Sequence, residues 1–568
     1  MCTHTEHGSG PGGALTRAAL PRWARGVAAP ALLTALAAAA WANSLSAPFI
    51  FDDRPAILGN PHIRQLWPLS RALSAPPRSI LGGRPVPGLT LAINYALGEL
   101  DVRGYHAFNL ALHVLSALIL LGIVRRTLAR SARLVSAARP LALVTAAIWL
   151  VHPLQTDAVT YVTQRTELLM GLFYLLTLYA AIRAAEGSRS WPWQTASVVS
   201  CALGMASKEV MITAPLMVML YDRVFLYPSL AEARRRRWPL YAGLMTTWAV
   251  LATLLMLSPP HHLLVLIPGG HASVLERGMT PWEYLRTQVG VIARYLGLAL
   301  WPHPLCLDHG LWVARTAGEV LPGALVVAGL VGGTAWALRR HPGTGFLGAW
   351  FLVVLAPTSS VVPVVTEVMA ERRMHLPLAA VAVAAVLGGY AAVGALVRSD
   401  SRRAALRVSL ALAVIATLTA LTARRNVDYG SEVSIWSDAA EKRPWNPRAH
   451  NNLGNALLRA GDLDGAFAQY AEAIRLEPDY AEAHYNLGNA FLRKGRPADA
   501  AASYAAALRI DPELAPAHYN LGNVQLAEGR FEDAIAHFSE VLRIDPDFEY
   551  ARTSLRVARE RLAAAGQR

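Results

Sequence analysis

The chain has 568 residues, of which 54% are apolar and only 16% charged, and its formal net charge is +14. Soluble globular proteins carry about 25% charged residues, so this composition argues against a purely soluble protein. Residues 1–440 hold 37 Lys and Arg against 21 Asp and Glu, whereas residues 441–568 hold 16 against 18. A basic excess confined to the apolar part indicates membrane-flanking loops before it indicates nucleic-acid binding.

Eleven apolar segments are predicted to cross a membrane, because their lengths approach the ~20 residues that a straight span needs. They are 27–45, 106–124, 139–152, 166–183, 192–207, 210–226, 239–257, 321–338, 345–357, 376–397 and 404–422. The first segment also resembles a secretory signal peptide with a cleavage site. We favour a retained first helix behind a cytoplasmic tail, residues 1–26, since the later spans already require a membrane protein.

The basic loops set the predicted orientation, since cations are translocated across a bilayer at a cost. Arginine groups at 125–133, 183–189, 234–237, 339–340 and 398–403 are all expected in the cytoplasm. If the apolar stretch Tyr284–Trp301 also crossed the membrane fully, every basic loop after it would lie on the wrong side. We therefore predict that it lies along the membrane or re-enters on the outer face. The membrane domain then spans 27–425, and the C-terminal part of the chain lies outside.

Four outer loops follow from this topology: 48–104, 151–166, 258–320 and 358–376. The first begins with two adjacent carboxylates, Asp52 and Asp53. Such a pair can act as a general base on a hydroxyl, bind a divalent cation or cap a helix.

Cations also gather in these loops. Arg165, Lys208 and Arg372 stand at membrane depth, where charges are costly and usually mark a pathway or a bound charge. Guanidinium groups match phosphate oxygens bidentately, so a lipid-linked phosphate is the expected partner. The alternative is that they contact ordinary lipid headgroups.

A strict 34-residue repeat begins after a predicted linker, 426–443. Pro444, Pro478, Pro512 and Pro546 keep this spacing, as do the Asn-Leu-Gly triplets that start at Asn452, Asn486 and Asn520. This period, with a small residue and an aromatic in the second helix, is the tetratricopeptide (TPR) signature. Residues 444–568 are predicted to form a solenoid of three repeats and a capping helix. The three asparagines are candidates for binding an acceptor peptide in the groove, or residues that pack neighbouring repeats.

Other common chemistries find no support. The chain has no Walker A loop, Gly-x-Gly-x-x-Gly turn, zincin helix or Gly-x-Ser-x-Gly elbow. Its three cysteines are widely spaced and include no Cys-x-x-Cys pair, so a thiolate metal site is poorly supported. We name no metal-ligating residues, and the need for a divalent metal stays open.

A set of loop motifs nevertheless resembles one known family. The motifs are Asp52-Asp53, Gly83-Arg84-Pro85, Asn94-Tyr95, Gly104-Tyr105-His106, His152-Pro153, Thr163-Gln164-Arg165, Ser207-Lys208-Glu209, Tyr221-Asp222-Arg223, Pro304–Asp308 and Glu371–Pro377. With C-terminal TPRs, this order resembles the transmembrane and tetratricopeptide repeat-containing (TMTC) family. That family is similar to protein O-mannosyltransferases of the GT-C class.

The resemblance implies an all-α fold: a polytopic GT-C-like membrane domain followed by a TPR α-solenoid. It implies transfer of a sugar, mannose in the family, from a polyprenyl or dolichyl phosphate to Ser or Thr of a protein on the outer face. Asp52 or Asp53 is then the catalytic base, with Asp52 slightly favoured. The donor phosphate is expected to contact Arg372, Arg373, Arg165, Lys208 and His375. Glu371, Arg84, His152 and Glu209 are expected to support that pocket.

Other functions stay open. The repeats also fit a non-enzymatic membrane scaffold, although eleven spans are many for an anchor. A GT-C transferase that acts on a lipid or glycan is a further alternative, as is a transporter. The Ala- and Arg-rich composition and the short repeat array suggest a bacterial protein in the inner membrane, with the solenoid in the periplasm. The expected partners are the lipid-linked sugar, a protein acceptor and membrane lipids, with no nucleic acid.

Overall fold

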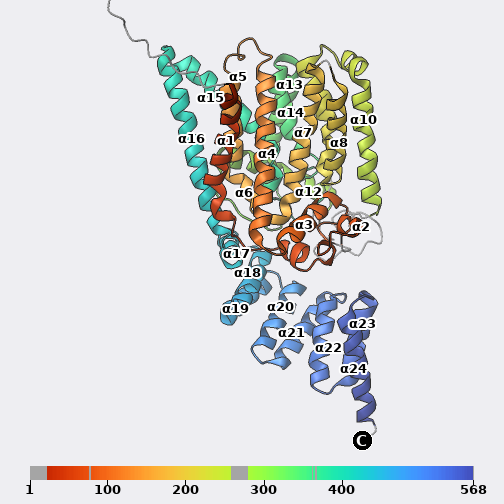
Figure 1. Cartoon of the computed structure of the whole chain (residues 1–568). Helices are drawn as coiled ribbons and strands as arrows, with labels where there is room; N and C mark the ends of the chain where they lie inside the picture. The colour runs from red at the N-terminus through yellow and green to blue at the C-terminus, as the bar shows by residue number, and fades with distance from the viewer. Residues whose placement is uncertain are drawn as a thin grey trace, which may run out of the picture.

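The computed structural model describes residues 22–75, 79–187, 189–257, 279–360, 363–364 and 367–566, with side chains from Val27 onward. The predicted tail 1–26 and the first part of the predicted outer loop 258–320 therefore lie largely outside the described residues. Within them every regular element is a helix, which confirms the all-α prediction. Figure 1 shows a bundle of helices with a separate solenoid beneath it.

Each predicted span is helical. The helices are α1 (Arg22–Trp41), α4 (Val102–Leu128), α5 (Ala138–Leu150), α7 (Arg165–Glu186), α8 (Trp191–Met205), α9 (Ala214–Tyr221), α10 (Leu230–Leu257), α13 (Ala317–Arg340), α14 (Pro342–Leu355), α15 (Pro377–Leu396) and α16 (Asp400–Asp428). Seven helices in the described residues are long and apolar enough to cross a membrane, and a bent pair built on α5 makes an eighth. Since α8, α9 and α14 are shorter, the count of eleven crossings stays a prediction.

The bundle has one large apolar core to which α4, α5, α7, α9, α14 and α15 all contribute. Small residues allow close approach within it. A Cβ on Gly122 of α4 would lie 2.8 Å from the ring of Tyr179 on α7, and one on Gly345 of α14 would lie 2.4 Å from the backbone of α13. The loop that joins α4 to α5 lies at the top of Figure 1, at the end of the bundle opposite the solenoid.

The solenoid end of the bundle carries a layer of short elements. They include α2 (Leu69–Leu73), α3 (Pro85–Gly98), α6 (Thr156–Val159), α12 (Pro281–Leu300) and the short helices η2 (Arg54–Leu58), η4 (Pro153–Gln155), η5 (Val162–Gln164), η6 (Glu209–Thr213) and η8 (Glu371–Met374). Along α12, Tyr284, Gln288 and Tyr295 donate hydrogen bonds of 2.7–2.8 Å to carbonyls of residues 358–370. The helix thus runs beside a predicted outer loop, and it is not among the candidate spans.

The solenoid consists of α18 (Pro447–Ala460), α19 (Leu463–Leu476), α20 (Ala481–Arg493), α21 (Pro497–Ile510), α22 (Ala515–Ala527), α23 (Phe531–Ile544) and α24 (Glu549–Ala565). These are the three predicted helix pairs and the capping helix. The repeated glycine explains the repeated aromatic: a Cβ on Gly454, Gly488 or Gly522 would lie within 2.8 Å of the Tyr470, Tyr504 or Phe538 ring.

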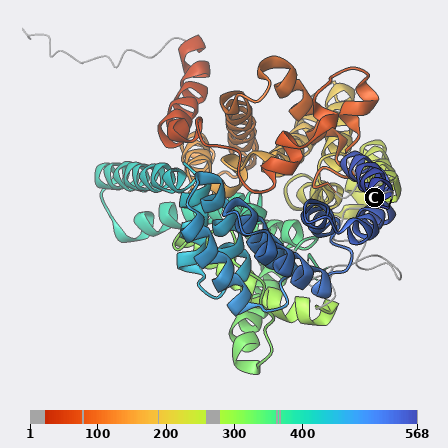
Figure 2. The same cartoon turned by 90° about the horizontal axis from the view of Figure 1, so that it is seen from below.

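The segment 426–443, predicted as a linker, is mostly helical. Helix α16 continues to Asp428, and α17 (Glu432–Lys442) follows after a short turn. A buried cluster joins Ile435 and Trp436 of α17 to Ile50, Tyr161 and Leu307 from three outer loops. Because α17 carries an apolar face, it packs as part of the bundle's outer layer. Seen from below, the solenoid extends from this contact across the outer face (Figure 2).

Candidate functional site

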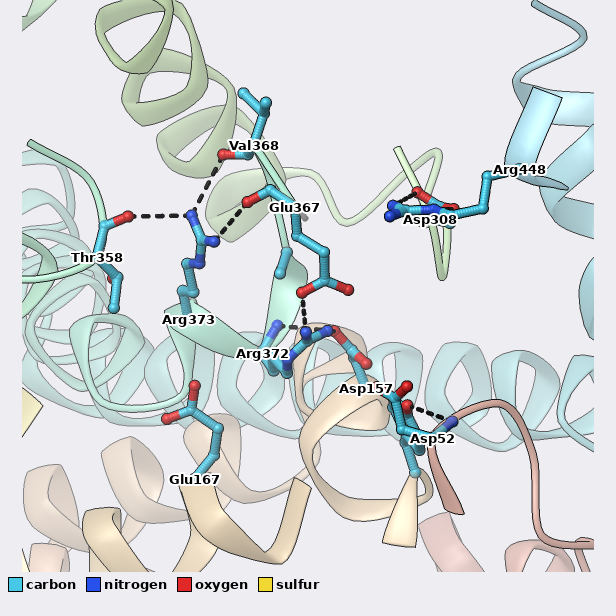
Figure 3. A network of polar contacts seen from close by, with 12 residues as sticks. Asp52, Asp157, Glu167, Asp308, Thr358, Glu367, Val368, Arg372, Arg373 and Arg448 are labelled. Carbon is cyan, nitrogen blue, oxygen red and sulfur yellow. Dashed lines mark hydrogen bonds and ion pairs between the residues drawn. The ribbon is translucent and has the colours of Figure 1, made fainter. Parts of the chain in front are cut away.

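A buried network of charged side chains lies where the outer loops meet beneath the bundle (Figure 3). Its centre is the basic residue Arg372 of η8. Its acidic members include Asp52 from the loop after α1, Asp157 of α6 and Glu367 just before η8. Residues distant in the chain meet here because η8 packs against η4 and α6. The loops therefore supply the side chains of the site, and the helices to which they are joined hold them in position.

Arg372 lies between two carboxylates. Its backbone N–H and Nη1 donate to Asp157 Oδ2 at 3.0 and 3.3 Å, and its Nη2 donates to Glu367 Oε2. Burial alone would lower the pKa of Arg372, but Glu367 and Asp157 raise it well above the ordinary value. The guanidinium is therefore permanently charged and already has internal acidic partners.

Asp52 faces this arginine from the loop after α1. Its side chain is half-buried, and its backbone N–H donates to the Tyr161 hydroxyl at 3.0 Å. Burial raises the pKa of the Asp52 carboxyl, against the opposing effects of the Tyr161 hydroxyl and Arg372. The preceding residue, Phe51, has φ +45°, in a region that side-chain-bearing residues rarely adopt. The chain therefore makes a sharp turn immediately before Asp52.

Asp53 plays a different part. Its carboxylate is fully buried and accepts backbone hydrogen bonds from Ile50 at 3.1 Å and from Thr163 at 2.7 Å. Burial raises the pKa of this carboxyl to about 7. Asp53 thus ties the loop after α1 to η5, and its oxygens are occupied by the backbone.

The neighbouring Arg373 points away from Arg372 (Figure 3). Its guanidinium donates to the carbonyls of Thr358, Val368 and Glu367 at 2.6–3.2 Å. These bonds hold Thr358, Glu367 and Val368 against η8. Arg373 is therefore placed to hold this loop, and it does not face Asp52.

Arg165 is also fully buried within the fold. It donates to Asn109 Oδ1 at 2.8 Å and to the carbonyls of Thr90 and Tyr105 at 3.1 Å, and it lies 4.5 Å from the Phe108 ring centroid. All these partners belong to α3 and α4. The sequence predicts that Arg165 binds the donor phosphate. In the structure its contacts join α7 to α3 and α4.

Lys208 forms a second ion pair near the network. Its Nζ lies 2.5 Å from Glu167 Oε1, and burial lowers the pKa of this ammonium group while Glu167 opposes the shift. Arg84 and Glu209, both predicted to support the pocket, form a pair of 3.2 Å beside it. The structure therefore brings these three predicted residues together, each with an acidic or basic partner.

The two predicted histidines lie in the packed interior. His375 Nδ1 contacts Gln155 Oε1 at 2.6 Å, and its ring rests on Gly171 of α7, where a Cβ would lie 2.6 Å away. Burial lowers the pKa of His375 well below its ordinary value, so the ring is neutral. His152 caps η4 through the Leu154 N–H and contacts the Ala299 carbonyl at 3.2 Å. Neither ring faces Arg372.

Glu371 connects the network to the solenoid side. It accepts from the Cys306 backbone at 2.6 Å and contacts His309 Nε2 at 3.0 Å. In the same loop Asp308 forms a bidentate pair with Arg448 of α18, at 2.6 and 2.7 Å. The first solenoid helix is thus bonded to the loop that also holds η8.

Sequence reasoning missed several members of the network. Asp157, Glu367 and Tyr161 surround Asp52 and Arg372, yet only Asp52 and Arg372 were predicted. Asp157 carried a usable signal, since it is the acidic residue of the predicted loop 151–166, which also contains the predicted residues His152 and Arg165. Among the residues that the structure describes, no group of three or more His, Cys, Asp or Glu is arranged to hold a metal ion.

The repeated asparagines contact neighbouring repeats. Asn486 Nδ2 donates to Asn451 Oδ1, and Asn520 Nδ2 to Asn489 Oδ1, both at 2.9 Å. Asn489 also accepts from the Tyr504 hydroxyl at 2.7 Å. These bonds fit the alternative in which the asparagines pack successive repeats together. Asn452 Nδ2 is buried with no hydrogen-bond partner in the described part of the chain.

Comparison with known proteins supports the predicted resemblance. A family model described as tetratricopeptide repeat matches residues 433–479, 451–515 and 485–547. Protein O-mannosyl-transferase TMTC3 of Mus musculus is 26% identical over 502 residues, which cover 79% of this chain and 51% of that protein. Protein O-mannosyl-transferase TMTC4 of Homo sapiens is 27% identical over 512 residues, 79% of this chain and 66% of that protein.

The likeness to these relatives confirms the TMTC resemblance over most of the chain, and the TPR match confirms the solenoid. The chain spans about half to two thirds of the length of these curated relatives. A solved TPR protein of Thermus thermophilus is 21% identical, with 28% of this chain and 93% of that chain covered at a TM-score of 0.21. This chain is an integral membrane protein with a C-terminal TPR solenoid.

Proposed function

We propose that this chain is a protein O-mannosyltransferase that moves mannose from a polyprenyl phosphate to Ser or Thr hydroxyls on the face that carries the solenoid. Its relatives are named protein O-mannosyl-transferases. The observation that carries the proposal is the half-buried Asp52 carboxylate directed at the Arg372 network. The bacterial inner membrane and a periplasmic solenoid remain part of this proposal.

The proposed transfer assigns each group a step. The Asp52 carboxylate accepts the proton of the acceptor hydroxyl while the oxygen of that hydroxyl bonds to C1 of the sugar. The bond between C1 and the phosphate oxygen breaks, and its electron pair leaves with the polyprenyl phosphate. Arg372 stabilises the negative charge that develops there, because a fixed cation in a buried site acts strongly on developing charge.

The donor must compete for Arg372. This side chain already contacts Glu367 and Asp157, so a phosphate oxygen reaches it by replacing one carboxylate. Glu367 is the better candidate for release, since it is more exposed than Asp157 and contacts only the side chain of Arg372, whereas Asp157 also accepts from the Arg372 backbone. Lys208 and Arg84 are already paired with Glu167 and Glu209, so they too would contact the phosphate only by releasing an acidic partner. Arg373, Arg165, Glu371, His152 and His375 would act by holding the loops.

The solenoid is proposed to deliver the polypeptide acceptor. Its first helix is bonded through Arg448 to the loop of Asp308, and both residues lie beside the Asp52 network in Figure 3, so an extended chain in the groove would pass near Asp52. TPR grooves suit extended peptides. The three Asn-Leu-Gly asparagines would then serve mainly to hold successive repeats in their relative positions. A membrane scaffold without transfer activity is the outcome that the experiment must distinguish.

The test uses the full-length protein, purified and reconstituted in lipid, with radiolabelled mannosyl polyprenyl phosphate and a Ser/Thr-containing peptide. We expect label on the peptide from wild type and a loss of about 10³-fold or more with Asp52→Asn. The matched control is Glu99→Gln, an exposed acid-to-amide change in the same outer loop that should transfer like wild type. Label on lipid or glycan but not on peptide would show that the acceptor is a lipid or glycan and not a protein. No transfer by wild type to any acceptor would favour the scaffold.

A further inference from the structure

An apolar cavity of about 470 Å³ extends from the loop between α4 and α5 into the bundle, as far as Ala379 and Ala380 in the first turn of α15. Its walls come from α4, α7, α14 and α15, through side chains such as Leu120, Leu175, Leu347 and Val383. Its volume falls in the ~300–1,000 Å³ range of ligand pockets. An unfilled apolar cavity leaves its lining atoms without contact partners, so this space favours an apolar occupant.

The mouth of this cavity is polar. Arg130 and Ser131, from the loop between α4 and α5, line it together with Thr127, which bonds the Tyr221 hydroxyl at 2.7 Å. An apolar interior with a basic rim is the arrangement that an amphipathic anion requires. A small soluble phosphate would leave the apolar part empty.

A second, strongly basic cavity shares the lining residue Arg130 with the first. Arg130 lines both cavities, and Arg125, Arg126 and Arg139 join it in the second, with Glu186 as the acidic lining residue. Glu186 pairs with Arg126 and, at 2.9 Å, with Arg130. Arg126 and Arg130 thus share one carboxylate, and Arg125 also lines the cavity, which leaves net positive charge for an anionic headgroup. The buried Nε of Arg126 has no hydrogen-bond partner in the described chain.

We infer that these two cavities bind an anionic phospholipid, with one acyl chain between α4 and α15 and its phosphate against Arg126 and Arg130. Basic pockets between spanning helices bind acidic lipid headgroups, and each Lys or Arg near the surface contributes about 1 kcal/mol. The loop between α4 and α5 is one that its arginines predict to face the cytoplasm, where this leaflet lies. Lipid binding at this site does not depend on the proposed transfer reaction.

The site is distinct from the proposed donor site. The Arg372 network lies at the solenoid end, whereas the arginines of this site lie beside the loop at the other end of the bundle (Figure 1). A polyprenyl phosphate whose phosphate rests on Arg372 would present only its hydrocarbon to this end. We therefore assign the basic cavity to a membrane phospholipid.

The test measures lipid binding by native mass spectrometry of the full-length protein with phosphatidylglycerol, with phosphatidylcholine of the same acyl chains and with undecaprenyl phosphate. We expect phosphatidylglycerol to bind most tightly. Arg130→Gln should weaken it about fivefold, the ratio that corresponds to one surface arginine. Arg133→Gln is the matched control, because this exposed arginine of the same loop lines neither cavity, and its binding should equal that of wild type.

Two further variants separate headgroup from chain. Arg130→Lys keeps the charge and should retain most of the binding, which distinguishes a lost contact from a misfolded protein. Ala380→Phe places a ring in the apolar cavity that Ala380 lines and should weaken phosphatidylglycerol although all four arginines remain. Equal binding of the two phospholipids, tighter binding of undecaprenyl phosphate, or wild-type binding by both Arg130→Gln and Ala380→Phe would overturn the assignment.

Discussion

The two adjacent aspartates show how neighbouring residues with the same side chain acquire different parts. The carboxylate of Asp53 accepts two backbone hydrogen bonds, whereas Asp52 is half-buried and faces Arg372. The chain turns at Phe51, which has φ +45°, and Asp53 already has helical backbone angles at the start of η2, so the two successive side chains point in different directions. The pair is thus one structural residue beside one candidate base.

We predict that Asp53→Asn destabilises the protein more than Asp52→Asn does. The N–H₂ group of an asparagine cannot accept a hydrogen bond, so one of the two backbone N–H groups that now bond Asp53 would lose its partner. Loss of such a charge-assisted hydrogen bond costs about 1.5–3 kcal/mol. Thermal unfolding of the two purified variants measures the difference. The reverse order of stability would mean that Asp52, and not Asp53, holds the loop.

The pH dependence of transfer should report Asp52. A base must be ionised, and burial raises the pKa of this carboxyl above its ordinary value of 3.8. Transfer should therefore rise with pH through a midpoint above that value and fall away on the acidic side. Values of kcat/KM, obtained from initial rates between about pH 4 and pH 8, test this prediction. An acidic limb at or below the ordinary value would contradict the environment described for Asp52.

Glu367 offers an opposite test of the network. If the donor phosphate replaces Glu367 on Arg372, then Glu367→Gln removes a competitor. We expect the KM for the lipid-linked sugar to fall about threefold to tenfold, up to about 1.4 kcal/mol of binding free energy. Arg372→Gln should raise the same KM and lower kcat. A rise in KM with Glu367→Gln would show that the carboxylate positions Arg372 instead.

At the scale of elements, α17 and α18 decide how the solenoid is held. The apolar face of α17 packs on the outer loops, and Arg448 of α18 makes a bidentate pair with Asp308. Glu432 adds contacts with Arg54 at 3.5 Å and with Arg459 at 2.7 Å. The segment expected as a linker therefore acts as a rigid joint.

We predict that Asp308→Asn and Arg448→Gln are coupled by about 1.5–3 kcal/mol, since the pair is largely buried and charge-assisted. A double-mutant cycle on the apparent unfolding free energy measures this coupling. The matched control is the exposed pair Lys494–Asp464 at 2.9 Å, which should couple by about 0–1 kcal/mol. Equal coupling in both cycles would mean that the joint depends on α17 alone.

The whole molecule combines a bundle, a layer of outer loops and a solenoid that begins on that layer (Figures 1 and 2). The buried contact with the outer loops involves α17 and α18, whereas α22–α24 pack among themselves and on α21. The distal repeats are thus separable from the candidate site.

We predict that a chain truncated after Asp511 keeps transfer to a short Ser/Thr peptide at close to the wild-type rate. Transfer to a long unfolded acceptor should fall at least about tenfold, because the distal groove raises its effective concentration at the site. The ratio of the two rates is the measurement. Equal rates with both acceptors would remove the solenoid from acceptor binding, and loss of both would show that the distal repeats stabilise the bundle.

The sequence alone determined the apolar helices, the 34-residue repeat and the loops that carry the polar residues, while the number of membrane crossings stays a prediction. Hydropathy and periodicity are local properties of the chain, so they can be read without a partner. The motif order also indicated Asp52 and Arg372, and the relatives support that resemblance.

Only the tertiary structure decided what each charged side chain contacts. Arg165, Arg373 and His375 have the residue types of a phosphate site, yet their contacts hold helices and loops together. Asp157 and Glu367 join Arg372 only after folding, from positions 215 and 5 residues away. A buried charge requires a partner within a few ångströms, and that distance depends on how the helices pack.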